Sequence, residues 1–274
     1  MTRPEHEMQS HARAEALELG FHQDLFDAAP RDIRAALGWR CEAVGGALLS
    51  VAANAPSILL NRTLGLGKRE PASAEAVDEI RQRYAKAGVE RYFIHLGPHA
   101  EPPQLRDWLA QAGLEPQRRW VKFERDARPA PEVTTDLRIA RVDASHAAAF
   151  GRIVAEGFDL PAPAAGLFPP VSQRPGWHLF GAFDADELVA AGVLFVRDGS
   201  AYLNFGATAP THRRQGAQGA LLAARIEAAR ELGCTVLFTE TGEEVPGDPQ
   251  HSYHNIERAG FVPAYRLDNY APRR

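Results

Sequence analysis

Apolar side chains recur at helical spacing near the start of the chain, at Ala14, Leu17, Phe21 and Leu25. Positions three or four residues apart lie on one face of a helix, so this pattern is typical of an amphipathic helix. We therefore predict one or two helices up to about Asp27.

The most apolar stretch of the chain runs from Cys41 to Leu60, and Glu42, Asn54 and Pro56 interrupt it. A membrane-spanning helix needs about 20 nearly uninterrupted apolar residues. The interruptions therefore favour two buried strands that are joined at Asn54–Pro56, and they argue against a membrane span.

The remainder of the first half alternates between helix and strand patterns. Ser73 is a suitable N-cap for a helix whose apolar face follows it, and Gly88 is a suitable stop. We expect a strand over 89–96, a second helix over 105–112 and a strand over 120–123. Residues 125–136 contain two prolines and no apolar periodicity, which predicts a linker.

After this linker the order of elements begins again. A helix over 145–156 follows a strand over 137–141, and a proline-rich loop at 158–175 precedes three meandering strands. We place these strands at 177–183, 187–196 and 201–208, and the later elements are a helix (216–232), a strand (235–239), a helix (252–259) and a strand (262–267).

The two halves of the chain resemble each other. The segment 79–96 (EIRQRYAKAGVERYFIHL) and the segment 225–241 (RIEAARELGCTVLFTET) both read as helix, glycine stop and buried strand. Gly88 and Gly233 are 145 residues apart, and a later pair, Gly113 and Gly260, is 147 apart. A nearly constant offset indicates a structural duplication. We therefore predict an α/β fold (α+β by some schemes) with two similar domains, residues 1–130 and 131–274.

The composition narrows the classes of function. The 274 residues are 45% hydrophobic and 24% charged, as is usual for globular proteins. Their net charge of −4 argues against a dedicated nucleic-acid binder, which usually carries a strong basic excess. Two cysteines are too few for a disulfide framework, and the first 20 residues lack the apolar core of a secretory signal. These features predict a cytoplasmic protein that binds neither nucleic acid nor membrane.

The loop at 207–219 (ATAPTHRRQGAQG) leads from a predicted strand into a long helix. The first N–H groups of a helix have no partner within it, and they lie at the positive end of the helix dipole. The loop is therefore suited to a phosphate or pyrophosphate. Gly216 and Gly219 would allow a ligand close to the backbone, and Arg213 and Arg214 add positive charge. A solvated basic helix start is the alternative interpretation of the loop alone.

Two segments resemble the GNAT superfamily of N-acetyltransferases. Thr208-Ala-Pro-x-His-Arg213-x-x-Gly216-x-Gln218, with Leu221-Leu222 after it, is similar to the acyl-CoA pyrophosphate motif V-x-P-x-x-R-G-x-G-x-G/A. SYHNIERAGFVPAY at 252–265 resembles the second motif of the superfamily. The resemblance covers about 137–270 and implies two GNAT-like domains, each a mixed, mostly antiparallel twisted sheet flanked by helices. The first half has LGLGKREPASAEA at 64–76 in place of the pyrophosphate motif, so it is similar to a degenerate domain.

The resemblance also implies a co-substrate, acetyl-CoA, held where the strands 201–208 and 235–239 splay apart. It implies that a bulge at Gly206 frees the edge of the first strand, and that Asn255 hydrogen-bonds the CoA arm. The residues it implies for main-chain and phosphate binding are Ala207, Thr208, Arg213, Arg214, Gln215, Gly216, Ala217, Gln218 and Gly219.

Two positions depart from the family pattern. Gln218 stands where glycine or alanine is commonest, which is tolerable if its side chain points away from the ligand. Ile256 stands where the family often has a tyrosine that serves as general acid, and isoleucine cannot donate a proton. The acid must therefore come from another residue.

The catalytic candidates follow from the chemistry of amine acetylation. An unperturbed ammonium is mostly protonated at pH 7, so a base is needed before the amine can attack a thioester. Glu240 is our candidate base, and its alternative is an exposed carboxylate at a strand end. Tyr253 is our candidate acid, and Tyr265 is more typical of a strand core. His251 and His254 offer two ligands where a metal site needs three or four, so we expect no metal.

We therefore predict an acyl-CoA-dependent N-acetyltransferase that moves acetyl from acetyl-CoA to a primary amine of a small molecule or a protein. The alternative is a non-catalytic acyl-CoA-binding or protein-interaction module, which Ile256 and the degenerate first half favour. The partner is then an amine acceptor, the protein is a monomer or a homodimer, and the first half has a structural role.

Overall fold

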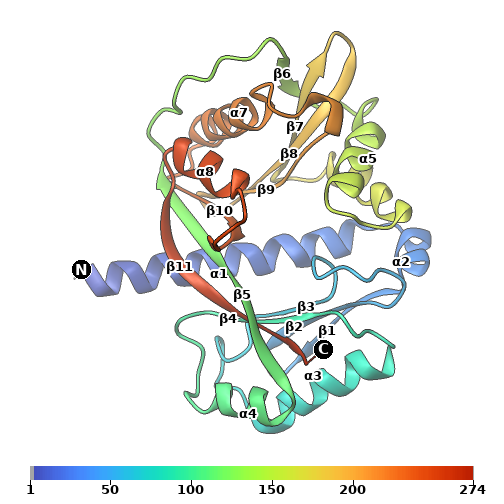
Figure 1. Cartoon of the computed structure of the whole chain (residues 1–274), viewed down its shortest axis with the longest axis vertical. Helices are drawn as coiled ribbons and strands as arrows, with labels where there is room; N and C mark the ends of the chain where they lie inside the picture. The colour runs from blue at the N-terminus through green and yellow to red at the C-terminus, as the bar shows by residue number, and fades with distance from the viewer. Residues whose placement is uncertain (1–2, 274) are drawn as a thin grey trace. The chain divides into compact units, whose positions relative to one another are not determined.

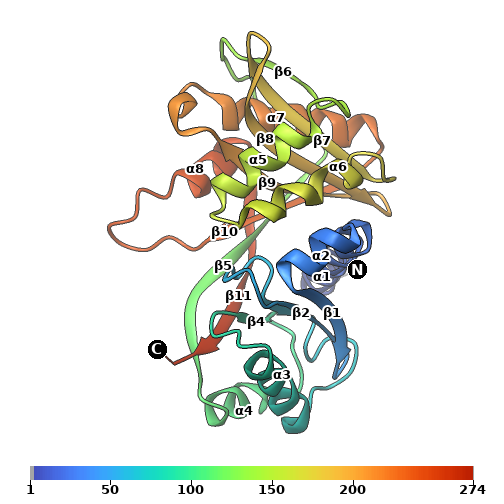
Figure 2. The same ribbon diagram turned by 90° about the vertical axis from the view of Figure 1, so that its right-hand side faces the viewer.

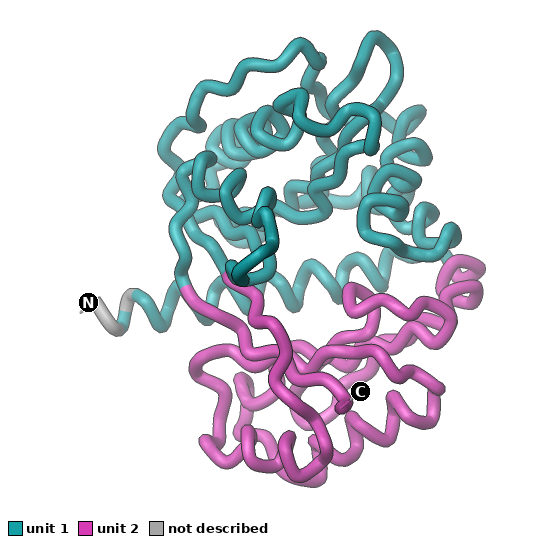
Figure 3. Tube along the Cα trace, viewed as in Figure 1, with its two compact units in different colours: residues 1–30, 122–264 teal, residues 31–121, 265–274 magenta. Residues whose placement is uncertain are grey.

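The computed structural model describes residues 3–273 and divides into two compact units (Figures 1 and 3). Unit 1 comprises the chain up to Pro30 together with Lys122–Ala264, and unit 2 comprises Arg31–Val121 and Tyr265–Arg274. These units differ from the halves 1–130 and 131–274 that the repeat suggests. The first helix is grouped with the second half, and the last residues of the chain are grouped with the first half.

The described residues form a mixture of helices and strands. The α-helices are α1 (Arg3–Ala28), α2 (Arg31–Leu37), α3 (Ala74–Lys86), α4 (Leu105–Gln111), α5 (Ala147–Gly157), α6 (Phe168–Val171), α7 (Ala217–Glu231) and α8 (His251–Arg258). The strands are β1 (Trp39–Val44), β2 (Ala47–Ala52), β3 (Arg62–Leu64), β4 (Phe93–Leu96), β5 (Leu114–Asp126), β6 (Arg138–Arg141), β7 (Trp177–Asp184), β8 (Glu187–Arg197), β9 (Ser200–Thr208), β10 (Val236–Gly242) and β11 (Val262–Pro272).

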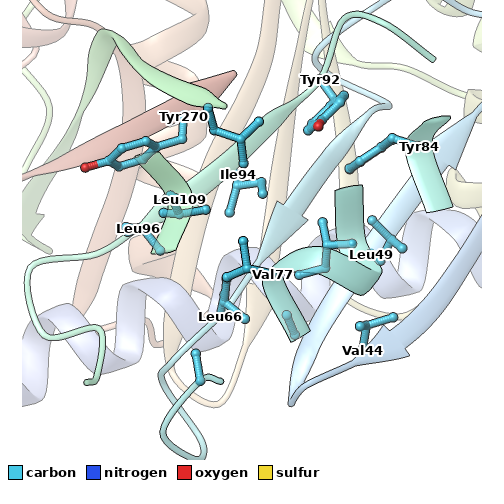
Figure 4. Close-up of a cluster of buried hydrophobic side chains, with 14 of the residues drawn as sticks. Val44, Leu49, Leu66, Val77, Tyr84, Tyr92, Ile94, Leu96, Leu109 and Tyr270 are labelled. Atoms are coloured by element: carbon cyan, nitrogen blue, oxygen red, sulfur yellow. The ribbon is translucent and has the colours of Figure 1, made fainter. Parts of the chain in front are cut away.

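The sheet of unit 2 contains the strands β1, β2, β3, β4 and β11 in this spatial order. β3 and β4 are parallel, whereas β1–β2, β2–β3 and β4–β11 are antiparallel pairs. The helix α3 begins after Ser73, whose side chain accepts a hydrogen bond from the Ala76 N–H. Its apolar face, which includes Val77, Ile80 and Tyr84, is buried against the sheet (Figure 4). This cluster is the hydrophobic core of unit 2.

The sheet of unit 1 runs β5, β10, β9, β8, β7, β6. β6 to β9 form an antiparallel meander, and β9 and β10 are parallel. Both α5 and α7 pack on β8 and β9, and Figure 2 shows α5 in front of these strands and α7 behind them. The two helices therefore cover opposite faces of the same strands.

The first helix, α1, is part of the core of unit 1. Phe21 is fully buried, and its ring stacks on Trp177 with centroids 4.7 Å apart. The carboxylate of Asp24 accepts hydrogen bonds from Arg174 Nε at 2.7 Å and from Trp177 Nε1 at 2.9 Å. Burial opposes ionisation of Asp24, but these hydrogen bonds and the charges of Arg174 and Arg197 outweigh it and lower its pKa. These contacts explain why α1 clusters with the second half of the chain.

Each half of the chain ends in a strand that enters the sheet of the other unit. Residues 122–126 of β5 belong to unit 1, where β5 neighbours β10. Residues 265–272 of β11 belong to unit 2, where Asp268, Asn269 and Tyr270 pair with β4. The two halves have thus exchanged their last strands.

Several predicted boundaries need correction. The turn in the apolar stretch is at Gly45 and Gly46, which have positive φ, and the segment 54–56 lies between β2 and β3. The predicted loop 158–175 contains a 3-10 helix (Ala162–Leu167) and α6. β5 and β11 are longer than the predicted strands 120–123 and 262–267. No helix within residues 3–273 is long and apolar enough to cross a membrane.

Candidate functional site

β9 and β10 part from each other after a short parallel ladder. The ladder joins Ser200, Ala201 and Tyr202 to residues 236–238, although β9 continues to Thr208 and β10 to Gly242. Beyond the ladder, Thr239 Oγ1 donates a hydrogen bond to the Leu203 carbonyl at 2.9 Å. A side chain thus replaces the next backbone bond, and the strands splay as expected.

A bulge lies in β9 next to this splay. The register with β8 runs from Ala207 opposite Ala191 to Asn204 opposite Val193, so β9 has one residue more than β8 between these pairs. The extra length falls at Phe205 and Gly206, and Phe205 has a φ of 49°. The expected bulge at Gly206 is confirmed.

A buried arginine from α7 supports the bulge. Arg225 Nη1 donates hydrogen bonds to the carbonyl oxygens of Val193 at 3.1 Å and Asn204 at 3.2 Å. Burial lowers the pKa of Arg225 to about 9, so the guanidinium remains charged at neutral pH. Its positive charge therefore lies next to the part of β9 that no longer pairs with β10.

The N-terminus of α7 has the character of an anion site. Gly216 is the N-cap, with a φ of 81°, and no side chain caps the helix among the described residues. The first N–H groups, those of Ala217, Gln218 and Gly219, have no acceptor inside the helix. Arg213 and Arg214 are exposed just before the helix. The loop thus combines three features: backbone N–H groups that lack an acceptor inside the helix, the positive end of the dipole of a 15-residue helix, and two guanidinium groups.

The two glycines of this loop face the linker. A Cβ on Gly216 would lie 2.9 Å from the carbonyl oxygen of Thr134, and a Cβ on Gly219 would lie 3.3 Å from Val133 Cγ1. Thr135 Oγ1 also donates a hydrogen bond to the Gln215 carbonyl at 2.7 Å. We expected these glycines to admit a ligand, but the segment that approaches them here is the linker.

Gln218 connects the start of α7 to β9. Its Nε2 donates a hydrogen bond to Thr208 Oγ1 at 2.8 Å, and its Oε1 would lie 2.7 Å from a Cβ on Gly206. The side chain therefore spans from α7 to the end of β9. A side chain on residue 206 would displace this amide, which gives Gly206 a second function besides the bulge.

The second motif forms α8. Tyr253 and Ile256 are its buried residues, and the ring of Tyr253 lies edge-on against Phe123 at 4.9 Å. Asn255 is half-buried, and its Oδ1 accepts a hydrogen bond from Arg258 at 2.6 Å. Ile256 is therefore a packing residue at the position of the family tyrosine.

Glu240 lies inside β10 and is not a solvated residue at a strand end. Its side chain is 10% exposed and forms an ion pair with the fully buried ammonium of Lys122. Lys122 Nζ also lies 2.7 Å from Glu18 Oε2, and 4.9 Å from the centre of the Tyr202 ring. Burial alone would lower the pKa of Lys122, but the charges of Glu18 and Glu240 outweigh it and raise the pKa. The alternative of an exposed carboxylate therefore does not apply.

The sequence reasoning missed Glu18 and Lys122. The signal was present, because Lys122 interrupts an apolar run between Val121 and Phe123, and Glu18 adjoins the apolar face of α1. Neither residue lies in the two motifs. Their importance follows only from the partners that the fold brings to them.

The two catalytic candidates lie on opposite faces of the sheet. Successive side chains of a strand point to opposite faces. Lys122 contacts Glu18 of α1, whereas its neighbour Phe123 contacts Tyr253 of α8. Glu240 therefore faces the α1 side and Tyr253 the α8 side. The structure brings neither close to the other.

The remaining polar candidates have ordinary contacts. His254 Nδ1 lies 3.4 Å from Glu257 Oε2, and His212 Nε2 lies 3.2 Å from Asp184 Oδ2. Within residues 3–273 no group of three or more histidine, cysteine, aspartate or glutamate side chains is placed to hold a metal ion. Burial raises the pKa of the Cys234 thiol, as is usual for a packing residue.

Comparisons with known proteins agree with this geometry. Residues 151–261 match the model of the Acetyltransferase (GNAT) family. No curated protein matches the chain. Among solved structures, a GCN5-related N-acetyltransferase from Kribbella flavida is similar with a TM-score of 0.64 and 18% identity, over 95% of each chain.

Two further structures are similar to this chain. A GNAT-family acetyltransferase from Colwellia psychrerythraea has a TM-score of 0.53 and 16% identity, over 85% of this chain and 82% of that one. A tandem GNAT protein from the clavulanic acid biosynthesis pathway has a TM-score of 0.55 and 16% identity, over 83% and 78%. The solved structures show the fold, and residues 151–261 are similar to the GNAT family. Together they support acyl-CoA-dependent acetyl transfer in general.

Proposed function

We propose that this chain, whose residues 151–261 carry the GNAT-family domain, is an N-acetyltransferase that moves acetyl from acetyl-CoA to a primary amine of a small molecule or protein. The observation that carries the proposal is the uncapped N-terminus of α7 next to the point where β9 leaves β10. An anion site and a free strand edge at one place suit a ligand with a pyrophosphate and an amide-containing arm.

The residues present fit such a ligand. The main chain of Ala207 and Thr208 lies on the splayed strand and would pair with the amide groups of pantetheine. Asn255 has a side-chain amide at the start of the second motif and would hydrogen-bond the same arm. The pyrophosphate would be held by Arg213 and Arg214 and by the loop residues Gln215, Gly216, Ala217, Gln218 and Gly219. Bound acetyl-CoA supplies the thioester from which acetyl is transferred.

Glu240 and Tyr253 are our candidate base and acid for a direct transfer. Glu240 accepts a proton from the ammonium of the acceptor, so that the nitrogen lone pair can attack. Tyr253 donates a proton to the sulfur that leaves, and an ordinary phenol pKa near 10 suits that task.

Calorimetry with acetyl-CoA and a panel of amines tests the proposal. We expect acetyl-CoA to bind at micromolar concentration, and we expect thiol release with one class of amine. Glu240→Gln should reduce this release at least tenfold while it leaves acetyl-CoA binding within about twofold, because the change removes the base and leaves the loop before α7 intact. Absence of acetyl-CoA binding at high micromolar concentration would refute the proposal.

A non-catalytic acyl-CoA-binding module is the second candidate. The buried Ile256 favours it, since the usual acid is missing. Acetyl-CoA binding without thiol release across primary amines, polyamines and lysine peptides would establish this candidate instead.

A further inference from the structure

Two residues from the first half of the chain are part of the charged cluster around Glu240. Glu18 is on α1, and Lys122 is on the exchanged strand β5. Both are in unit 1 together with Glu240. Neither residue is in the segment that matches the family, so the cluster is a feature of this chain beyond its GNAT domain.

The cluster places one ammonium between two carboxylates. Lys122 has no exposed side-chain surface, Glu18 has 4% and Glu240 has 10%. Lys122 Nζ lies within ion-pair distance of both carboxylates. Glu240 is the more exposed of the two, and it therefore is the carboxylate that solvent or an acceptor can reach.

Because Lys122 has two carboxylate partners, Glu240 can become neutral without leaving the ammonium unpaired. A buried ammonium that loses a single carboxylate partner is left uncompensated, which is strongly unfavourable. If Glu240 alone paired with Lys122, uptake of a proton by Glu240 would create that situation. With Glu18 present, Lys122 keeps a charged partner when Glu240 becomes neutral. The second carboxylate also repels the charge on Glu240, which favours protonation.

We infer that Glu18 and Lys122 are positioning residues for Glu240, with Lys122 fixing its carboxylate and Glu18 allowing it to accept a proton without leaving the buried ammonium unpaired. The inference rests on the proposed function, in which Glu240 is the base. The step moves one proton from the acceptor's N–H to a Glu240 oxygen, and solvent later removes it. The first half then contributes to catalysis as well as to structure.

Other titratable groups face this cluster. The phenol oxygen of Tyr202, on β9, is 3.4 Å from Lys122 Nζ. On α1, Glu15 and His22 lie one turn before and one turn after Glu18, at the spacing that shares a helix face. Tyr253 lies on the other face of the sheet. A change at Glu18 or Lys122 leaves all four groups in place, so their influence on the pKa of Glu240 is the same in every variant.

The inference predicts shifts of opposite sign. Glu18→Gln removes a neighbouring negative charge, so the pKa of Glu240 should fall by roughly one unit. Lys122→Met removes the positive charge, so the same pKa should rise by roughly one unit or more. The acid limb of the kcat/KM profile should move to lower pH in the first variant and to higher pH in the second. A weaker base should also lower kcat for Glu18→Gln by about three- to tenfold.

Two measurements on the full chain test this. Carbon-13 NMR of glutamate-labelled protein follows the carboxyl titration directly, with Glu240→Gln to assign its signal, and pH profiles of thiol release follow catalysis. Glu231→Gln, an exposed carboxylate of α7, is the matched control and should leave both unchanged. Glu18→Gln preserves shape, so it decides the question if Lys122→Met does not fold.

The outcomes separate this inference from the proposed function. Opposite shifts of the Glu240 pKa together with the matching movements of the acid limb support it. Active Glu18→Gln protein with an unmoved pKa and acid limb would overturn it, while acetyl-CoA turnover would still support the transferase. Failure of the wild-type chain to bind acetyl-CoA would overturn the function first, and the positioning role with it. A purely structural ion pair would alter the melting temperature and the titration of Glu240, but it would leave the acid limb of the thiol-release profile unmoved.

Discussion

The starts of α7 in unit 1 and α3 in unit 2 occupy corresponding places in the repeat, but they differ in how their N–H groups are used. In α7 the N-cap is Gly216, and no side chain caps the helix among the described residues. In α3 the N-cap is Ser73, whose hydroxyl accepts a hydrogen bond from the Ala76 N–H at 3.2 Å. The Ala72 N–H just before it donates to the Glu101 carbonyl at 2.8 Å.

The loop before α3 is also in contact with another segment of unit 2, the one that contains Glu101. The Glu101 N–H donates to the Gly67 carbonyl at 2.8 Å, and a Cβ on Gly67 would collide with the Glu101 carbonyl oxygen. The segment after β4 therefore lies where a pyrophosphate would approach in the other half. We propose that residues 1–130 have lost the acyl-CoA site in this way, and that their remaining contributions are α1 and β5.

The helices α7 and α3 also differ in the side chain that each buries at a corresponding position. Arg225 of α7 follows Ile80 of α3 by 145 residues, the spacing of the glycine stops Gly88 and Gly233. Arg225 donates to two backbone carbonyls at the β9 bulge, whereas Ile80 is fully buried in an apolar core. A bulge releases carbonyl groups that need a donor, and a regular short strand does not. At this position the bulge in unit 1 thus requires a buried donor, whereas the corresponding position of unit 2 carries an apolar side chain.

The sharpest test of this comparison is Gly216→Val. A β-branched residue is strained at a φ of 81°, and its Cβ would contact the Thr134 carbonyl. We expect the first turn of α7 to be displaced and the acetyl-CoA affinity to fall more than about 100-fold, or roughly 2.7 kcal/mol, by calorimetry.

Gly233→Val is the matched control, because Gly233 has a similar φ of 79° with nothing within 4 Å of its Cβ position. This variant should share the backbone strain and keep its acetyl-CoA affinity within about twofold. Gly67→Ala in unit 2 should likewise leave the affinity unchanged. Equal losses at Gly216 and Gly67 would mean that the two loops are not functionally different.

Arg225→Met tests the support of the bulge. The change removes the donor from the Val193 and Asn204 carbonyls, and each buried acceptor without a partner costs about 1–3 kcal/mol. We expect the free energy of unfolding, measured with urea, to fall by about 2 kcal/mol. Acetyl-CoA affinity should fall as well, because the edge of β9 is no longer held.

Ile80→Val is the control at the corresponding position of unit 2. It should cost about 1 kcal/mol of stability through lost packing and should leave the affinity unaltered. Arg225→Met protein with wild-type affinity would show that the guanidinium serves packing alone.

The sequence allowed part of this difference to be predicted. The helix patterns, the glycine stops and the Gly206 bulge depend on local properties of a few neighbouring residues. The exchange of β5 and β11 could not be predicted, because an alternating strand is equally suited to the sheet of either unit. Lys122 has the pattern of a solvent-facing residue in its strand. It is buried only because α1 brings Glu18 to that face, a contact between residues more than 100 positions apart in sequence.

Ser73→Ala should have the smallest effect. This variant tests whether the Ser73 cap alone excludes a ligand from unit 2. Loss of an N-cap side chain costs about 1 kcal/mol, so urea unfolding should detect a decrease of that size. Acetyl-CoA stoichiometry should remain one per chain, because the Glu101 carbonyl still binds the Ala72 N–H and still lies against Gly67. A second binding site in this variant would contradict our account, since it would mean that Ser73 and not the segment at Glu101 closes the loop. Thr is the conservative replacement, and it should restore the stability because its hydroxyl caps helices nearly as well.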